Sequence, residues 1–225
     1  MSSKISSTLM GTIVPAGIYC SEQVGRLSGS LLPAEEELLG PRTVDKRRIE
    51  FAAGRTCARG ALRLLGRPSA PLLQGKRHEP LWPEGVVGSI THCKNYCAAA
   101  VAGTKAYATI GIDAEPNEPL PAGTLKLIAR PRELAWIASR KEQDVCWDRL
   151  LFSIKESIYK VWYPLEKCWL EFDQVEIQVH TGTQTFQAIV LRNAPSCPSL
   201  LRGAFLNTGS HLLTCVSVRA PVCSH

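Results

Sequence analysis

The sequence predicts an α+β protein built from two similar lobes. The chain has 225 residues, enough for one large domain or two small ones with a sizeable core. Hydrophobic residues make up 45% and charged residues 20%, a composition typical of globular rather than disordered proteins. In each half of the chain, segments with apolar residues at helical spacing are followed by segments typical of strands. This recurrence favours two lobes that pack together, each with a small sheet covered by helices.

The first half of the chain contains one long helical pattern, expected from about Val44 to Leu65. Gly66 and Pro68 follow it and are typical of a helix end. Apolar and small side chains supply one side of this helix, which should face a core. The other elements expected in this half are a strand within Gly11–Cys20, a short helix over Pro33–Leu39 and strands over Val86–His92 and Tyr96–Ala102.

Arginines recur along one flank of the 44–65 helix. Arg48, Arg55 and Arg59 follow at steps of seven and four, and Arg63 continues the series. Such a stripe is commonly just a solvated helix face. Its functional interpretation is a rail for phosphate groups, because guanidinium donors match phosphate oxygens. Spacing alone leaves both interpretations open.

The second half is organised around a helix that begins near Leu150 and is expected to stop at Pro164, because proline lacks the N–H that continues the helix. Its apolar stripe should face a core. Between residues 125 and 140 the pattern predicts two short helices broken near Pro131. Strands are expected over 109–116, 174–180, 184–192, 201–207 and 211–219.

Acidic side chains at two places suggest chemistry with a metal ion. Asp113 and Glu115 are two residues apart on the 109–116 strand and therefore share one face, opposite Ile110 and Ile112. Neighbouring carboxylates repel each other unless a cation lies between them, and Mg²⁺ or Mn²⁺ prefers oxygen ligands. A solvated strand end is the simpler alternative.

Glu156 and Lys160 form the second place. They are four residues apart in the 150–164 helix and so project from the same face. By themselves they predict a surface ion pair worth a few tenths of a kcal/mol. Together with the acids upstream, the carboxylate could act as a metal ligand or base and the ammonium as a proton donor.

Nine cysteines are scattered along the chain without a C-x-x-C pair, and the polar segment Met1 to Leu9 does not resemble a signal peptide. No apolar run approaches the roughly 20 residues that cross a bilayer. We therefore expect reduced thiols, a cytoplasmic location and no membrane partner. His92, Cys93 and Cys97 could be read as zinc ligands, but a second pair at suitable spacing is missing, so no zinc site is expected.

The net charge of +6 favours an anionic partner, which could be a phosphorylated cofactor, an acidic protein or nucleic acid. A basic nucleic-acid-binding protein would be expected to have aromatic residues among its basic ones, and the 44–65 helix has only Phe51. A metal-dependent nuclease or other phosphotransferase would use the same acids and lysine, and stays open at this point.

The ordered motifs resemble those of the 4′-phosphopantetheinyl transferases, and more narrowly the large monomeric, Sfp-type group. The two principal motifs are Gly111-Ile-Asp113-Ala-Glu115 and Phe152-Ser-Ile-Lys155-Glu156-Ser-Ile-Tyr-Lys160. The segments that agree with them are Phe51-Ala-Ala-Gly-Arg55-Thr-Cys-Ala-Arg59, Glu79-Pro80-Leu-Trp82-Pro83, Gly88-Ser-Ile-Thr91-His92-Cys and Trp147-Asp148-Arg-Leu-Leu-Phe-Ser. The match runs from about residue 40 to 180, and the motif sequences are most similar to those of actinobacterial members that serve polyketide, peptide and lipid synthases.

The resemblance implies a two-lobed fold, with lobes over residues 1–105 and 106–225, the active site between them, and a monomer. It implies transfer of the 4′-phosphopantetheine arm of coenzyme A to a serine of an apo acyl or peptidyl carrier protein, with release of 3′,5′-ADP. Nucleic acid is then not a partner. Carrier proteins tend to be acidic near that serine, which suits the basic chain.

The resemblance also implies roles for individual residues. Asp113, Glu115 and Glu156 match the carboxylates that hold Mg²⁺ on the pyrophosphate, and Glu156 is the candidate base for the serine proton. Lys160 matches the lysine that assists the departing phosphate. Residues implied in binding coenzyme A are Arg47, Arg55, Lys76 or Arg77, Thr91, His92, Asp113, Lys155 and Lys160.

Overall fold

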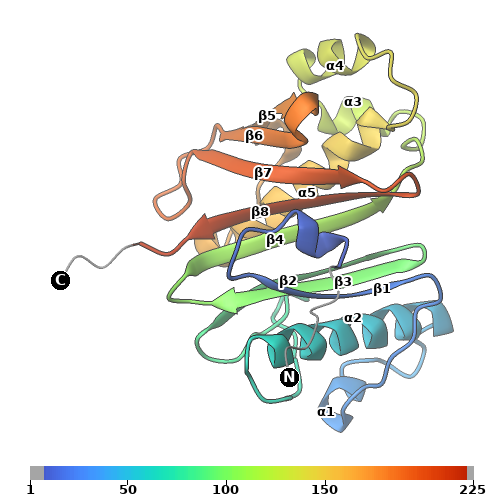
Figure 1. Ribbon diagram of the computed structural model, residues 1–225, viewed down its shortest axis with the longest axis vertical. Coiled ribbons are helices and arrows are strands. Elements are labelled where there is room, and N and C mark those ends of the chain that lie inside the picture. The colour runs from blue at the N-terminus through green and yellow to red at the C-terminus, as the bar shows by residue number, and fades with distance from the viewer. Residues whose placement is uncertain (1–7, 222–225) are drawn as a thin grey trace, which may run out of the picture.

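The computed structural model describes residues 8–221 and shows two antiparallel sheets, of three and five strands, each packed with helices (Figure 1). This confirms the predicted α+β class. Of the amino-terminal segment for which no signal peptide was expected, residues 1–7 lie outside the described residues, as does Cys223. The eight described cysteines are all free, in agreement with reduced thiols. Within residues 8–221, no helix has the length and apolar character needed to span a membrane.

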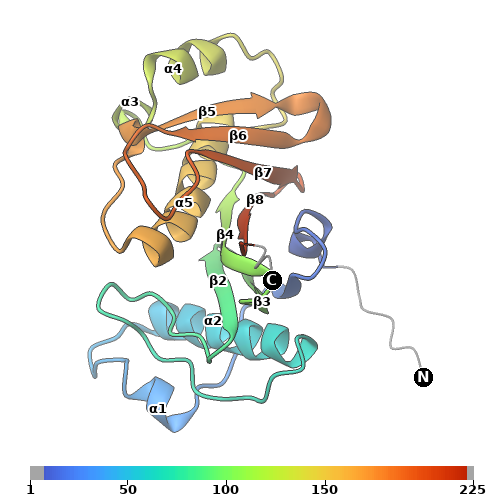
Figure 2. The ribbon, with the colours of Figure 1, turned by 90° about the vertical axis from the view of Figure 1, so that its left-hand side faces the viewer.

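The N-terminal lobe contains the three-stranded sheet, whose strands are ordered β1-β3-β2. The long helix α2 packs on one face of this sheet, through small residues such as Ala58 and Ala61 against Ala99 and Val101 of the central strand. Figure 2 shows α2 crossing the sheet below the larger lobe. The bounds are β1 Tyr19–Val24, α1 Pro33–Glu36, α2 Asp45–Leu64, β2 Val86–Cys93 and β3 Tyr96–Gly103.

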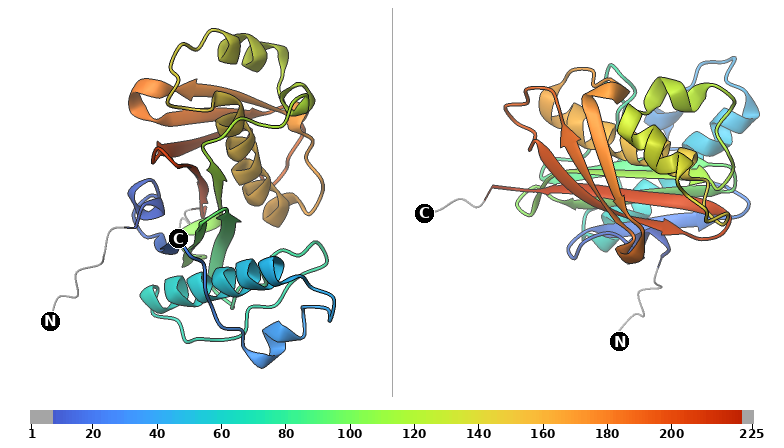
Figure 3. Two further views of the ribbon diagram at one scale, coloured as in Figure 1. Left: turned by 90° about the vertical axis from the view of Figure 1, so that its right-hand side faces the viewer. Right: turned by 90° about the horizontal axis from the view of Figure 1, so that it is seen from above.

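The C-terminal lobe contains the five-stranded sheet, ordered β4-β8-β7-β6-β5, with α5 packed against it (Figure 3). Leu150, Ile154, Ile158 and Val161 of α5 are fully buried in this core, as the apolar stripe predicts. The bounds are β4 Tyr107–Pro116, α3 Thr124–Ile128, α4 Pro131–Ala138, α5 Trp147–Glu166, β5 Val175–His180, β6 Thr185–Val190, β7 Leu200–Asn207 and β8 His211–Arg219.

The lobes meet where β2 lies beside β4. Side chains join these two strands: Ser89 Oγ accepts the N–H of Ile112 at 3.2 Å, and Thr91 Oγ1 accepts the N–H of Ala114 at 3.0 Å. Because both partner numbers rise together, β2 and β4 run in the same direction. The 110–114 segment of β4 is thereby tied to the first lobe, while its backbone ladder pairs with β8 of the second.

Each lobe contains a buried glutamate that binds a cation of its long helix, and we call these two pairs the glutamate staples. Glu35 of α1 is fully buried and accepts a hydrogen bond from Arg59 of α2 at 2.6 Å. Glu133 of α4 is 3% exposed and accepts one from Lys155 of α5 at 2.8 Å. Both short helices begin with proline, and both glutamates also accept a backbone N–H from beyond the long helix. The matching staples support the expectation of two similar lobes.

Several element boundaries differ from the sequence predictions. Pro164 does not stop its helix: α5 continues to Glu166, and the left-handed residue Lys167 ends it by donating its N–H to the carbonyl of Tyr163. In the last turn, proline forgoes a single helical hydrogen bond, so the helix can continue past it. The first strand begins only at the end of the expected range Gly11–Cys20: a 3₁₀ turn occupies Met10–Thr12, and β1 runs over Tyr19–Val24.

Candidate active site

Strand β4 separates an apolar face from an acidic one. Ile110, Ile112 and Ala114 lie in the core shared with β1 and β3. Asp113 and Glu115 lie on the opposite face and contact α5. The predicted sharing of one face by the two acids is therefore confirmed, and that face is covered by the helix that carries Glu156 and Lys160.

Asp113 is 5% exposed and surrounded by donors. The ammonium of Lys160 binds its Oδ1 at 2.8 Å and also donates to the carbonyl of Ile112 at 3.0 Å. The hydroxyls of Thr91 and Ser153 donate to Oδ1 at 3.1 Å and Oδ2 at 2.8 Å. Lys160 thus pairs across the structure with Asp113, and not with its helical neighbour Glu156 as spacing alone would suggest.

Glu115 binds the guanidinium of Arg149, with Nη1 of the arginine 3.0 Å from Oε2. Burial and the nearby carboxylate of Asp113 together raise the pKa of Glu115 to about 7, against the opposing effect of Arg149. The two acids of β4 therefore interact electrostatically, as their spacing predicts.

Glu156 lies one turn before Lys160 and faces a groove between the lobes. Burial raises the pKa of its carboxyl above the ordinary value, with Lys160 opposing the shift and Asp113 adding to it. A carboxylate in this setting is a better base than one in water, because its proton affinity is higher.

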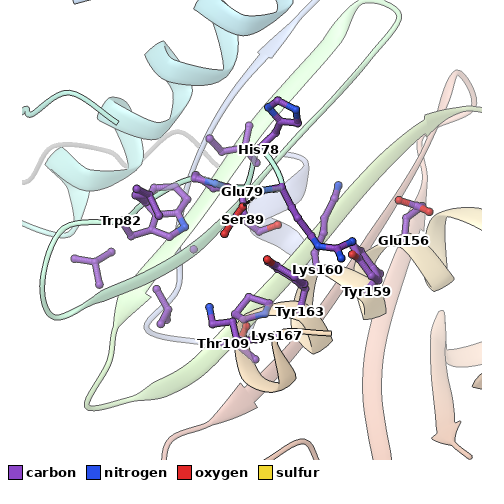
Figure 4. Close-up of a pocket in the computed structure, with 18 residues that line it drawn as sticks. His78, Glu79, Trp82, Ser89, Thr109, Glu156, Tyr159, Lys160, Tyr163 and Lys167 are labelled. Carbon is purple, nitrogen blue, oxygen red and sulfur yellow. Dashed lines mark hydrogen bonds between the residues drawn. The ribbon is translucent and has the colours of Figure 1, made fainter. Parts of the chain in front are cut away.

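The groove has a volume of about 530 Å³. Figure 4 shows Glu156, Tyr159, Lys160 and Tyr163 along α5 on one side, and His78, Glu79 and Trp82 from the first lobe on the other. Of the predicted site residues, the groove brings together Arg77, Glu156 and Lys160. Arg77 lies over the rings of Tyr163 and Trp169, at 5.8 Å from each centroid. Lys76 is exposed on the adjacent turn.

Basic groups form a second cluster along the first half of α2. Arg55 is 5% exposed and lies 4.2 Å from the ring centroid of Phe51. Its Nε and Nη2 are buried and find no hydrogen-bond partner among residues 8–221. Burial lowers the pKa of Arg55 to about 10, so the group remains charged at neutral pH. A buried cation with free donors is suited to an anionic ligand.

Arg47 and His92 belong to the same cluster. Arg47 Nη1 lies 3.3 Å from Nε2 of His92, and Nδ1 of the imidazole lies 3.9 Å from Glu50. Burial lowers the pKa of His92, which favours the neutral ring. Two arginines of the predicted phosphate-binding stripe are engaged in ion pairs: Arg59 binds Glu35, and Arg48 lies 3.9 Å from Glu36.

Two residues expected to contact coenzyme A are positioned differently. The ammonium of Lys155 is buried in the core of the second lobe, where it donates to Glu133 and to the carbonyls of Ile128, Phe172 and Val175. With four acceptors it has no donor left for a nucleotide. The hydroxyl of Thr91 is likewise used inside the protein, between Asp113 and the N–H of Ala114. Both side chains therefore make their hydrogen bonds inside the protein and not to a ligand in the groove.

Asp113, Glu115 and Glu156 offer the oxygen ligands that a hard divalent ion prefers, although they are not arranged as a preformed metal site. Among residues 8–221, no three histidine, cysteine, aspartate or glutamate side chains are close enough to hold a metal. Lys160 and Arg149 balance the charge of Asp113 and Glu115 instead. All three proposed ligands are oxygen donors, and the raised pKa of Glu115 shows that its charged form lacks full compensation.

Sequence reasoning missed Arg149, Ser153 and Gly111. Arg149 and Ser153 lie inside motifs that resembled the family but carried no assigned role, and their spacing from the acids gives no signal. Gly111 precedes Asp113 by two residues, and a Cβ there would lie 1.9 Å from the carbonyl oxygen of Ser157. Glycine at this position lets α5 approach β4 closely enough for Lys160 to reach Asp113.

Two protein-family models match most of the chain. The model of the 4′-phosphopantetheinyl transferase N-terminal domain matches residues 34–102, and that of the 4′-phosphopantetheinyl transferase superfamily matches residues 109–216. The chain is 51% identical over 168 residues to 4′-phosphopantetheinyl transferase Svp of Streptomyces mobaraensis, covering 74% of this chain and 68% of that protein.

Two further relatives are similar over more of their length. The chain is 43% identical over 180 residues to 4′-phosphopantetheinyl transferase PptT of Mycobacterium tuberculosis, covering 78% of this chain and 79% of that protein. It is 44% identical over 191 residues to 4′-phosphopantetheinyl transferase Npt of Nocardia iowensis, covering 81% and 85%. These matches give no support to the nuclease alternative.

Proposed function

This chain belongs to the 4′-phosphopantetheinyl transferase superfamily and transfers the 4′-phosphopantetheine arm of coenzyme A to carrier proteins, and we propose that it does so in the groove between its lobes. The hydroxyl oxygen of a carrier serine attacks the β-phosphorus of coenzyme A. The bond between that phosphorus and the bridging oxygen breaks, 3′,5′-ADP leaves, and the serine proton passes to a base of the enzyme.

The observation that carries this proposal is the contact between the acidic face of β4 and α5. Lys160, which lines the groove with Glu156, binds Asp113, and Arg149 of the same helix binds Glu115, so that residues from two distant motifs are joined beside the groove. Carboxylates beside an ammonium suit phosphoryl transfer, since the reacting group carries several negative charges that must be bound and balanced.

Asp113, Glu115 and Glu156 are the residues that we propose hold Mg²⁺ or Mn²⁺. When bound, the ion would supply charge neutralisation at the pyrophosphate of coenzyme A. Ser153 and Thr91 fix the orientation of Asp113, as outer hydrogen bonds do for metal-binding carboxylates. Lys160 balances Asp113 before substrate arrives and is close enough to the groove to offset charge on the leaving oxygen.

Glu156 is our candidate base for the serine proton. Burial raises the pKa of its carboxyl, which favours proton uptake, and it faces the groove where the serine must enter. Arg55, Arg47 and His92 would bind the phosphate at the far end of the nucleotide, and Arg77 would bind the nucleotide along the groove. These groups orient coenzyme A and take no part in bond making.

Replacing Glu156 with glutamine tests the assignment. We expect Glu156→Gln to lower the transfer rate by about 10²–10⁴-fold, the usual contribution of a positioned base. Coenzyme A should still bind through the Arg55 cluster, and the unfolding temperature should not fall. The rate is measured by the mass change of an apo carrier protein and binding by calorimetry.

Glu142→Gln is the matched control, because Glu142 is an exposed glutamate of the same lobe. It removes the same charge away from the groove and should leave the rate unchanged. Transfer by Glu156→Gln at the wild-type rate would overturn the role of Glu156.

We propose further that the lobes span residues 1–105 and 106–225 and that the protein acts as a monomer. The division is supported by the staples, since each lies within one of these ranges. Light scattering of the purified protein measures the mass of the particle, and a dimer would contradict the second statement.

A further inference from the structure

Arg149, near the start of α5, binds three acceptors with one guanidinium group. Nη1 donates to Glu115 Oε2 at 3.0 Å, Nε to the carbonyl of Glu118 at 2.9 Å, and Nη2 to the carbonyl of Pro119 at 2.8 Å. The side chain is 17% exposed, and its carboxylate partner 19%. One arginine therefore joins an acid of the proposed metal site to the loop that follows β4.

That loop, residues 117–120, is fixed to the beginning of α5 by other contacts as well. Asp148 Oδ2 accepts the N–H of Leu120 at 2.8 Å. Asn117 accepts the N–H of Cys146 at 2.9 Å and donates to the carbonyl of Asp144 at 2.8 Å. These anchors hold the loop whether or not Glu115 is engaged, whereas Arg149 alone among the described residues binds the loop and Glu115 together.

The geometry at Glu115 leaves room for a second partner. Arg149 binds Oε2, and within residues 8–221 no hydrogen bond involves Oε1. A carboxylate held through one oxygen by a neighbouring donor, with the other oxygen available, is the usual arrangement of a metal ligand supported by an outer hydrogen bond. Asp113 differs in this respect, because Lys160 binds its Oδ1 and Ser153 binds its Oδ2 from farther along α5.

We propose that Arg149 is a positioning residue that sets the orientation of Glu115 for a divalent ion and links it to the 117–120 loop. This inference rests on the proposed metal site. Its basis is geometric: only a guanidinium has donors in the planar fork that reaches Glu115, Glu118 and Pro119 at once, and lysine has the same charge without that fork.

The test compares Arg149→Lys and Arg149→Gln with wild type in the presence of coenzyme A. Free Mn²⁺ is counted by electron paramagnetic resonance, which reports binding independently of turnover. Loss of an outer hydrogen bond of this kind weakens metal binding by about 10–100-fold. We expect at least a tenfold higher Mn²⁺ dissociation constant in both variants, and for Arg149→Lys a transfer rate that recovers when Mn²⁺ is raised to saturation.

Arg132→Gln is the control for charge, because Arg132 is an exposed arginine of the same lobe whose ion pair lies with Glu176. It should bind Mn²⁺ as wild type does. Wild-type Mn²⁺ affinity in a folded Arg149→Lys protein would overturn the inference and leave the metal site standing. Tighter binding in Arg149→Gln would also overturn it, since charge would then outweigh orientation. Absence of Mn²⁺ binding by wild type with coenzyme A would overturn both.

Discussion

Glu115 lies in a balance of opposing electrostatic influences. Burial and the carboxylate of Asp113 raise its pKa to about 7 from an ordinary value of 4.5, against the effect of Arg149. A carboxyl with a raised pKa keeps a proton in the folded protein that the unfolded chain has already lost. The site is therefore under strain at neutral pH unless a further cation compensates the charge.

The raised pKa predicts how stability changes with pH when divalent ions are removed by EDTA. Between about pH 4.5 and 7 the folded state binds more protons at Glu115 than the unfolded state, so the free energy of unfolding falls as pH rises. Glu115→Gln cannot titrate. Between pH 5 and 8 we expect wild type to lose about 2 kcal/mol relative to Glu115→Gln in urea unfolding.

The same comparison with Glu142→Gln should not reproduce this loss, because Glu142 is exposed. A difference between wild type and Glu115→Gln that stays constant from pH 5 to 8 would show that Glu115 is ionised without penalty. It would contradict the proposed closeness of the two acids.

At the residue scale, strand periodicity was enough to place Asp113 and Glu115 on one face. The cations that bind them could not be predicted from the sequence. Helical spacing brings Lys160 next to Glu156, whereas the fold brings it to Asp113, 47 residues away. Lys155 shows the same limit. Its position beside Glu156 in a motif suggested a ligand contact. In the structure its ammonium is instead buried in an ion pair with Glu133, and breaking that pair would lower the free energy of unfolding by about 3–5 kcal/mol.

At the element scale, the site depends on how closely α5 approaches β4. Gly111 permits this approach, because the carbonyl oxygen of Ser157 lies where a Cβ would be. The contact also sets the distance between Lys160 and Asp113, since the two residues lie on the two elements in question. Strand and helix thus form one rigid support for the candidate site.

Gly111→Ala should separate the two elements. We expect a loss of about 1–3 kcal/mol in the free energy of unfolding, the usual cost of overpacking. Because a misplacement of about 1 Å can cost 10²-fold in rate, the transfer rate should fall by at least tenfold. Denaturant unfolding and the carrier mass assay measure the two effects.

Gly40→Ala is the control, because a Cβ at Gly40 meets no atom within 4 Å. It should leave both measurements near wild type. Unchanged stability and transfer in Gly111→Ala would mean that the approach of α5 to β4 is not needed.

Most helices and strands could be predicted from the spacing of apolar residues and from the glycines and prolines at their ends, including the break before Pro131. The helix was wrongly predicted to stop at Pro164, because a proline in the last turn costs only one helical hydrogen bond. The helix ends at Lys167, which has a left-handed backbone conformation that a lysine in the sequence seldom signals. The first strand was misplaced because the first thirty residues have only weak apolar alternation.

At the scale of the whole molecule, two similar lobes face each other across a groove. The recurrence of helices and strands predicted the lobes, but the matching staples of Glu35 and Glu133 emerge only in three dimensions. The groove itself could not be predicted, since its walls come from the 77–90 and 156–167 segments, which spacing does not relate. A net charge of +6 suits encounter with acidic carrier proteins.

The most direct test of the central claim is the intact mass of an apo carrier protein after incubation with this protein, coenzyme A and Mg²⁺. We expect the carrier to gain the mass of one phosphopantetheine arm, and we expect EDTA to prevent the gain because the carboxylate site would lack its ion. A gain that persists in EDTA would contradict the metal site. No gain on any of several acyl and peptidyl carriers, from a folded sample, would contradict the transfer reaction itself.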